Sequence, residues 1–158
     1  KREQFVRNVE RARIANEAKA DLFLRLHCDA VAESGFATYH PVRQGTVAGK
    51  TGPRKEVLQA SKRFAPTFHR AAIRSLNGMV SDRGVRTDLH TAIGAKQGAL
   101  TGSIFCEVPV LLLEIAGLKN QRDEKALSTQ AGIKKMASAI AAGVKAVVRP
   151  AVREPGTR

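Results

Sequence analysis

The sequence predicts an α/β fold in which a twisted, mixed or mostly parallel sheet is flanked by helices. Two apolar runs, 22–26 and 108–113, are short and bounded by turn residues, as buried strands of such sheets are. Segments with helical spacing alternate with the predicted strands, which is typical of layered α/β domains. Few strands can be recognised and the chain starts in a helix, so we expect the first strands of the sheet to be missing from it.

Three segments are predicted to be helices that cover this sheet. Residues 8–18 are rich in good helix formers. Residues 55–79 carry apolar side chains at helical spacing, and we expect Pro66 to break or kink the helix near its middle. Apolar residues recur at the same spacing between 133 and 147, which indicates an amphipathic helix that packs on the sheet.

The remaining segments are predicted to be short strands and loops. Residues 36–41 and 85–93 have the composition of strands, and the glycine-containing segments 44–54 and 94–103 that of loops. Within the first loop, Gly45–Thr51 is similar to a phosphate-binding loop. It is one residue short between its glycines and is followed by Gly-Pro, so nucleotide binding is not the favoured interpretation.

The length of 158 residues predicts one domain, which we place at 1–148, followed by a tail or linker at 149–158. A chain of this size buries about 68–70% of its unfolded surface without needing disulfides. We expect Cys28 and Cys106 to be buried free thiols. No apolar run approaches the ~20 residues of a membrane span, so we expect no such span. We also expect the protein to be a monomer.

The chain is strongly basic, with 27 Lys and Arg against 14 Asp and Glu and a net charge of +13. Such a balance attracts polyanions, with nucleic acid, anionic lipid surfaces and bacterial wall phosphate polymers as the candidates. The six Phe and one Tyr are scattered, so no stacking platform for single strands is visible and no specific nucleic-acid partner is expected. Most of these cations, taken singly, are explained as solvated helix faces.

His27 and Glu114 are the candidate functional residues, because each follows one of the apolar runs. Ligands in open α/β sheets bind beyond the carboxyl ends of the strands, so two parallel strands would bring both side chains to one edge. Catalytic zinc takes ligands such as His and Glu, and a further carboxylate takes the proton of the metal-bound water. The pair therefore favours a zinc hydrolase site, with a buried structural histidine as the alternative for His27. An acid directly after three leucines must be paired, protonated or functional.

Other residues bear on this site. His40 and His90 lie at presumed strand or loop ends, from which either could approach it, whereas His69 is expected at the surface of the long helix. Arg25 is unusual in a buried strand and must reach the edge of the sheet, pair with an acid, or lie in a less buried segment. No HxxxH, HExxH or CxxC pair occurs, so local spacing does not give a complete metal site.

An ordered series of short motifs runs through most of residues 8–147. In this order the motifs resemble the zinc-dependent N-acetylmuramoyl-L-alanine amidases of the third type, which cut the bond between muramic acid and the stem peptide of peptidoglycan. The motifs that carry the resemblance are Arg11–Asn16, Ala20–Ala30, Gly35–Tyr39, Arg83–Val85, Pro109–Ile115, Gly117–Asn120 and Asp123–Glu124.

The resemblance implies a twisted mixed sheet flanked by helices, with His27 as a zinc ligand and Glu114 as the catalytic acid or base. Asn120, His40 and His90 would then be expected near the substrate. The family's other two ligands, a His in a Gly-His-Gly motif and a later Glu, come earlier in its chains and have no counterpart here. We therefore expect a missing segment, and little hydrolase activity from these 158 residues alone.

The resemblance also implies a place and a partner for the protein. The partner would be peptidoglycan, with anionic wall polymers as further partners, and the location secreted or cell wall, or cytoplasmic until lysis if a phage encodes it. Two features depart from the family: Arg25 would disfavour Zn²⁺ beside His27, and residues 94–107 form a longer segment that could cover the substrate cleft. A degenerate wall-binding module and a charge-driven polyanion binder are the alternatives.

Overall fold

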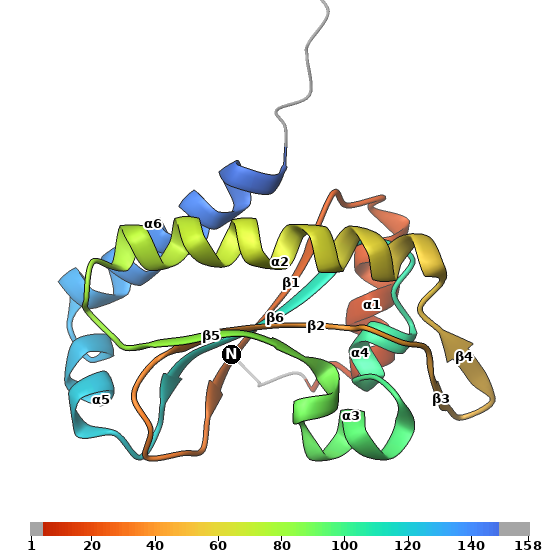
Figure 1. Ribbon diagram of the computed structural model, residues 1–158, viewed down its shortest axis with the longest axis horizontal. Helices are drawn as coiled ribbons and strands as arrows, with labels where there is room; N and C mark the ends of the chain where they lie inside the picture. The colour runs from red at the N-terminus through yellow and green to blue at the C-terminus, as the bar shows by residue number, and fades with distance from the viewer. Residues whose placement is uncertain (1–4, 149–158) are drawn as a thin grey trace, which may run out of the picture.

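A computed structural model describes residues 5–148 of the chain (Figure 1). Its centre is a four-stranded sheet with the order β1-β6-β2-β5. The strands are β1 (Phe23–Asp29), β6 (Val110–Gly117), β2 (Phe36–His40) and β5 (Asp82–Thr87). β1 is parallel to β6 and β2 is parallel to β5, whereas β2 and β6 are antiparallel. The prediction of a mixed α/β sheet is therefore confirmed.

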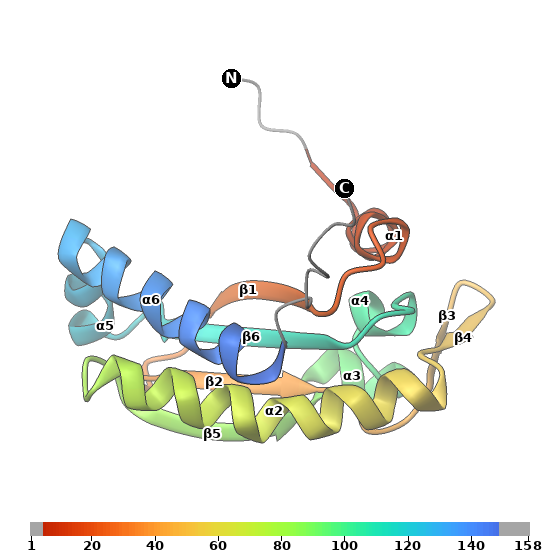
Figure 2. The same cartoon turned by 90° about the horizontal axis from the view of Figure 1, so that it is seen from above.

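Two long helices, α2 (Lys55–Leu76) and α6 (Gln130–Val147), lie side by side on one face of the sheet (Figure 2). Their apolar sides pack on Leu111 and Leu113 of β6, which point to that face because side chains alternate along a strand. The main core is therefore formed between the sheet and this helix pair. Its buried residues are Phe36, Ala65, Phe68, Ala72, Leu76, Val80, Leu111, Leu113, Met136 and Ala139.

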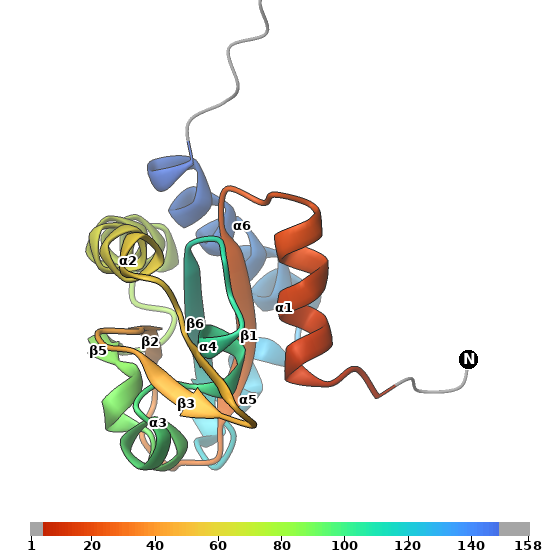
Figure 3. The ribbon, with the colours of Figure 1, turned by 90° about the vertical axis from the view of Figure 1, so that its right-hand side faces the viewer.

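Helix α1 (Asn8–Glu17) lies on the opposite face of the sheet from α2 (Figure 3). It contacts the short helix α4 (Thr101–Ile104). Leu100, which precedes α4, packs on Leu112 in a second cluster with Ala37 and Tyr39. This face is thus built around a different set of side chains from the main core.

The connections complete the fold. A hairpin of β3 (Gly45–Val47) and β4 (Lys50–Gly52) precedes α2. The 3-10 helix η1 (Asp88–His90) and α3 (Ala92–Gln97) follow β5, and α5 (Gln121–Leu127) follows β6. The predicted tail at 149–158 lies outside the described residues.

All three predicted helices are present, and the break expected at Pro66 is the point that needs a correction. The predicted helices at 8–18 and 133–147 are present as α1 and α6. Pro66 does not break α2, which continues to Leu76. Proline removes the bond to the carbonyl four residues earlier, and both Pro66 and Lys62 are exposed, so water can satisfy that carbonyl.

The predictions for the connecting segments were less accurate. The expected strand at 85–93 starts earlier and ends at Thr87, and short helices replace the second half of it and much of the loop at 94–103. The segment 44–54 holds the β3–β4 hairpin rather than a plain loop. Its turn contains Ala48 and Gly49, both with positive φ, and no helix opens at the Lys-Thr pair, which excludes a phosphate-binding loop.

The prediction that His69 lies at the surface was wrong. Its side chain is 8% exposed and lies between α2 and the sheet. The two ring nitrogens bond Thr38 Oγ1 at 3.0 Å and Asp82 Oδ1 at 2.7 Å. His69 therefore ties α2 to β2 and β5, because a buried imidazole needs partners for both nitrogens.

The remaining expectations on the fold concern thiols and membranes. Cys106 is buried and Cys28 is partly buried, and both are free, so the prediction of free thiols is confirmed while Cys28 is less buried than expected. No helix within residues 5–148 has the length and apolar character needed to cross a lipid bilayer.

Candidate functional site

The structure brings His27 and Glu114 together. They are register partners in the parallel pair of β1 and β6, so their Cα atoms face each other across adjacent strands. Glu114 does not lie at the strand end as predicted, because β6 continues to Gly117, and His27 also lies within β1. The two residues are nonetheless neighbours, since the parallel register fixes the pairing whatever the strand length.

Both side chains lie on the face of the sheet that α2 and α6 do not cover. Leu111 and Leu113 point into the helix-covered core, so Leu112 and Glu114 point the other way. In β1, Leu22 and Leu24 pack on that same core, which places Phe23, Arg25 and His27 on the opposite face. Glu114 and His27 therefore share one face of two adjacent strands.

Glu114 is held in an environment that favours its neutral form. Burial and, to a smaller extent, the negative charge of Asp29 raise its pKa from the ordinary 4.5 to about 7, although the positive charges of Arg83 and Arg25 oppose the change. Its Oε2 atom is buried and has no hydrogen-bond partner among the described residues. A carboxyl group with these properties is suited to give and take protons near neutral pH.

This pKa predicts a pH-dependent stability of the metal-free protein. The folded value lies above the unfolded one, so the contribution of Glu114 is full below pH 4.5 and is lost as the pH rises through about 7. In urea unfolding from pH 5 to 8, Glu114→Gln should therefore gain stability relative to wild type as the pH increases. Parallel curves for the two proteins would contradict the raised pKa.

His27 is partly buried and is kept neutral. Burial lowers its pKa, and the positive charges of Arg25 and Arg11 lower it further. The neutral imidazole is the form that binds metals or accepts protons. The positive charge of Arg25 thus acts on the protonation of His27 as well as on any metal beside it.

Arg83 is a functional candidate that the residue patterns alone did not single out. Its side chain is 4% exposed and bonds Asp29 Oδ2 at 2.9 Å and Glu33 Oε2 at 3.1 Å. Arg83 belongs to the edge strand β5, and its bond to Asp29 links β5 to the end of β1, the strand at the opposite edge of the sheet. Its charge also acts on Glu114. The sequence signal was the Arg83–Val85 motif, which marked the position but not this contact.

Within residues 5–148, Arg25 neither pairs with an acid nor lies in an exposed segment, contrary to what its position in a strand led us to expect. Its side chain is buried, no carboxylate among the described residues lies within salt-bridge distance, and Nη1 has no partner. Nη2 lies 3.5 Å from Asn8 Oδ1 of α1. The guanidinium packs on Gly102, where a Cβ would lie 2.7 Å from its Cζ, so α4 can cover it only with glycine there.

Asn120 has a structural role in this fold. Its Oδ1 accepts from the backbone N–H groups of Arg122 and Asp123 and so caps α5, and its Nδ2 donates to Ala32 O at 2.8 Å. The amide is therefore engaged on both sides. Substrate binding by Asn120 stays a prediction, and these bonds already explain the residue without it.

His40 and His90 lie towards the other end of the sheet from Glu114. Glu114 pairs with Ala37, whereas His40 is three residues further along β2 and pairs with Thr87. His40 is buried, with Nδ1 3.1 Å from the carbonyl of Pro41, and His90 closes η1 through Thr87. The structure does not bring either imidazole to the His27–Glu114 pair, and their contact with substrate stays a prediction.

The family model described as N-acetylmuramoyl-L-alanine amidase matches residues 1–146. The chain belongs to this amidase family. A search for similar proteins of curated function finds no significant match to the amidase chain.

Solved structures with similar coordinates show the same fold. The catalytic domain of CwlV, an N-acetylmuramoyl-L-alanine amidase from Bacillus (Paenibacillus) polymyxa var. colistinus, is 24% identical with a TM-score of 0.66, covering 90% of this chain and 65% of its own. The amidase AmiC2 of Nostoc punctiforme is 18% identical with a TM-score of 0.67, and the match covers 90% of this chain and 66% of AmiC2. The amidase from Clostridium difficile 630 is 19% identical with a TM-score of 0.67, and the match covers 89% of this chain and 64% of that amidase. The chain thus spans just under two thirds of these three amidases.

The described residues do not form a complete metal site. Within residues 5–148, no group of three or more His, Cys, Asp and Glu side chains is arranged to hold a metal ion. His27 supplies one imidazole, and the unpartnered Oε2 of Glu114 is the nearby acid. One imidazole and one carboxyl group do not meet the three-ligand requirement of catalytic zinc, so the described residues do not fit zinc by themselves.

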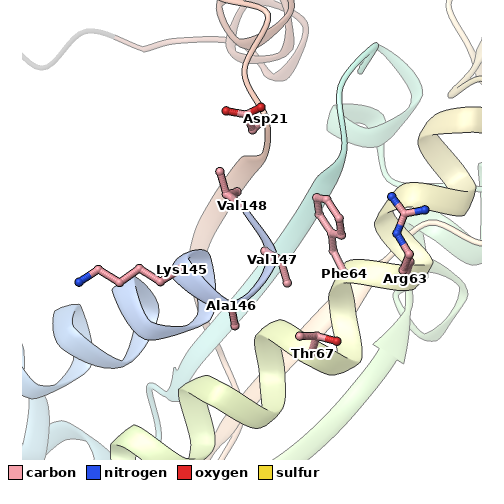
Figure 4. Close-up of a pocket in the computed structure, with 8 residues that line it drawn as sticks. All are labelled: Asp21, Arg63, Phe64, Thr67, Lys145, Ala146, Val147 and Val148. Carbon is pink, nitrogen blue, oxygen red and sulfur yellow. The ribbon is translucent and has the colours of Figure 1, made fainter. Parts of the chain in front are cut away.

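The chain also has a groove that lies away from this pair. It measures about 550 Å³ and lies between α2, the end of α6 and Asp21, two residues before β1 (Figure 4). Phe64, Val147 and Val148 line it, with Arg63 on α2 and Lys145 on α6 among its residues. The groove is therefore on the helix-covered side, and the chemistry of Glu114 and His27 lies on the other.

Proposed function

We propose that the protein is a peptidoglycan hydrolase that cleaves the amide bond between N-acetylmuramic acid and the L-alanine of the stem peptide. The observation that carries the proposal is the register pairing of His27 with Glu114, on the sheet face that α2 and α6 do not cover, in a chain of the amidase family. Peptidoglycan is accordingly the proposed substrate, and a secreted or wall location, or release at lysis, the proposed setting.

Glu114 would act as the general base and acid of this reaction. As a carboxylate it takes a proton from the attacking water, and as a carboxylic acid it returns that proton to the leaving nitrogen. A pKa of about 7 suits both steps, because the two forms are then comparably populated at neutral pH. The unpartnered Oε2 leaves one oxygen free for this exchange.

Zinc is the proposed cofactor, with His27 as the one ligand that the described residues offer. Bound zinc would lower the pKa of a coordinated water to ~7 and polarise the amide carbonyl. The two further ligands would have to come from outside residues 5–148. Neutral His27, kept so by burial, has the protonation state that such a ligand needs.

Digestion of purified sacculi by the full-length protein tests the proposal. We expect release of stem peptides with a free L-alanine amino group and intact glycan strands, and loss of this release on treatment with a chelator, because removal of zinc removes the activated water. Restoration by added Zn²⁺ is the control. Cleavage within the glycan, or release that a chelator leaves unchanged, would contradict the proposal.

A second function, a wall-binding module without hydrolase activity, is favoured by one observation. The described residues hold no complete set of metal ligands. The same assay separates the two, because a binding module would sediment with sacculi while the full-length protein with added Zn²⁺ released no stem peptide.

A further inference from the structure

We propose that the outer surface of the α2–α6 helix pair is a docking surface for the anionic phosphodiester polymers of the bacterial wall. The inference rests on the proposed wall-directed function and deepens it, since it names a second partner and the surface that binds it. The charges of the two helices, their packing and the side of the sheet on which they lie support it.

Helix α2 carries a row of exposed cations. Its exposed cations are Lys55, Lys62, Arg63, Arg70 and Arg74, against one acid, Glu56, in its first turn. Positions 55, 62 and 70 fall on one side of a helix with 3.6 residues per turn, and 22 residues extend for ~33 Å. The row is therefore long and straight enough to follow several phosphates of an extended polymer.

Helix α6 widens this surface. It contains no Asp or Glu, and its cations Lys134, Lys135 and Lys145 are all exposed. α2 and α6 pack against each other, and the groove at their junction is lined by Arg63 and Lys145 together with one acid, Asp21 (Figure 4). No cation of either helix forms a salt bridge with a described residue. Their charges are thus available to an external anion.

The apolar content of this surface argues against a lipid partner. A helix that lies in a membrane interface must bury an apolar side in the lipid. In α2 that side is already buried against the sheet, through residues such as Phe68 and Leu76. Among the exposed large apolar residues, Ile133 is the one that belongs to either helix. A charged, water-soluble polymer fits this surface better than a membrane.

The packing also argues against duplex nucleic acid. A DNA major groove of ~12 Å admits one helix. α2 and α6 lie side by side along the sheet, so neither can enter such a groove alone (Figure 2). Base-specific reading of a duplex is therefore disfavoured, and contact with backbone phosphates is tested by binding to duplex DNA. A flexible single chain with phosphates along its length can instead follow the surface of both helices.

The location of the docking surface makes it compatible with catalysis. α2 and α6 cover one face of the sheet, whereas Glu114 and His27 lie on the other. A polymer bound on the helices would leave the reactive face free. The protein could then be retained on the wall by one side while the other side meets the peptide.

The test compares two quadruple variants of the full-length protein that lose the same charge. One replaces Lys62, Arg70, Arg74 and Lys134 by Gln. The control replaces four exposed lysines outside α2 and α6, namely Lys19, Lys50, Lys96 and Lys119. Binding to purified poly(glycerol phosphate) is measured across a salt series, with anionic vesicles and duplex DNA as comparison ligands.

We expect the helix variant to lose roughly 100-fold in affinity at 0.1 M salt. The slope of log affinity against log salt concentration should become shallower by about 2–3, since each lost phosphate contact reduces that slope by ~0.7. The control should change by less than about threefold, because distant charges are screened. Equal losses in both variants, or tighter binding of wild type to vesicles or DNA than to the polymer, would overturn the inference. Release of stem peptide from a soluble polymer-free fragment, measured in parallel, reports on the proposed hydrolase function separately.

Discussion

Replacing Glu114 by Gln should lower the rate of stem-peptide release by about 10²–10⁴-fold, the usual contribution of a general acid or base. The amide has nearly the same shape as the carboxyl group but cannot accept the proton of the attacking water. Release is measured on purified sacculi with the full-length protein, and the loss should appear in kcat with little change in KM. Retention of more than about a tenth of the activity would be incompatible with proton transfer by Glu114.

The control for this prediction separates chemistry from folding. Exposed Glu107→Gln should leave the rate unchanged. At pH 8, Glu114→Gln should be at least as stable as wild type, because it removes a half-buried carboxylate whose pKa burial has raised. If Glu114 were merely structural, the variant would lose stability together with activity. Thermal unfolding of the three proteins distinguishes these outcomes.

Asp123→Ala should lower the free energy of unfolding by about 3–5 kcal/mol, since it leaves buried donors without partners. Asp123 is fully buried and accepts from Ser34 Oγ at 2.5 Å and from the backbone N–H groups of Gly35 and Gly117, both at 2.9 Å. It thus joins the end of β6 to the segment that enters β2. Urea unfolding measures the change.

Two further variants serve as controls for Asp123→Ala. Asp21→Ala, at an exposed acid, should change the stability by no more than about 0.5 kcal/mol. Asp123→Asn keeps one acceptor oxygen and should fall between wild type and Asp123→Ala. A loss of less than about 1 kcal/mol for Asp123→Ala would show that the three bonds contribute little.

The pairing of His27 with Glu114 could be predicted because it depends on few facts about the chain. Two apolar runs, each followed by a polar residue, predict parallel neighbours, and parallel register then brings the polar residues together. The amphipathic pattern of 133–147 likewise needs only helical spacing. Both predictions use a periodicity that tertiary contacts reinforce.

The errors arose where tertiary contacts override local signals. The strand end after Glu114 was misplaced because Gly117 still pairs with Asp29 of β1, past a shift in the register, although the apolar run has stopped. His69 was assigned to the surface from its basic neighbours, but Thr38 and Asp82 approach it from two strands that are distant in sequence. Such contacts leave no local pattern in the chain.

The positions of His40 and His90 illustrate a second limit. Both lie at ends of elements, as predicted, but β2 is antiparallel to β6, so the end of β2 is directed away from the end of β6. The direction of a strand cannot be read from its own residues. A histidine at a strand end is therefore near the reactive pair only when its strand runs the same way.

The separation of the two sheet faces has a consequence for how the protein tolerates change. Residues that anchor the fold, such as Phe68 and Leu113, belong to the core between the sheet and the helix pair. Glu114 and His27 lie outside this core, on the other face of the sheet. Substitutions on the two sides share few neighbours, and their energetic effects should then add. The reactive surface can accordingly diverge in sequence, towards new peptides or towards inactivity, while the scaffold beneath it is inherited unchanged.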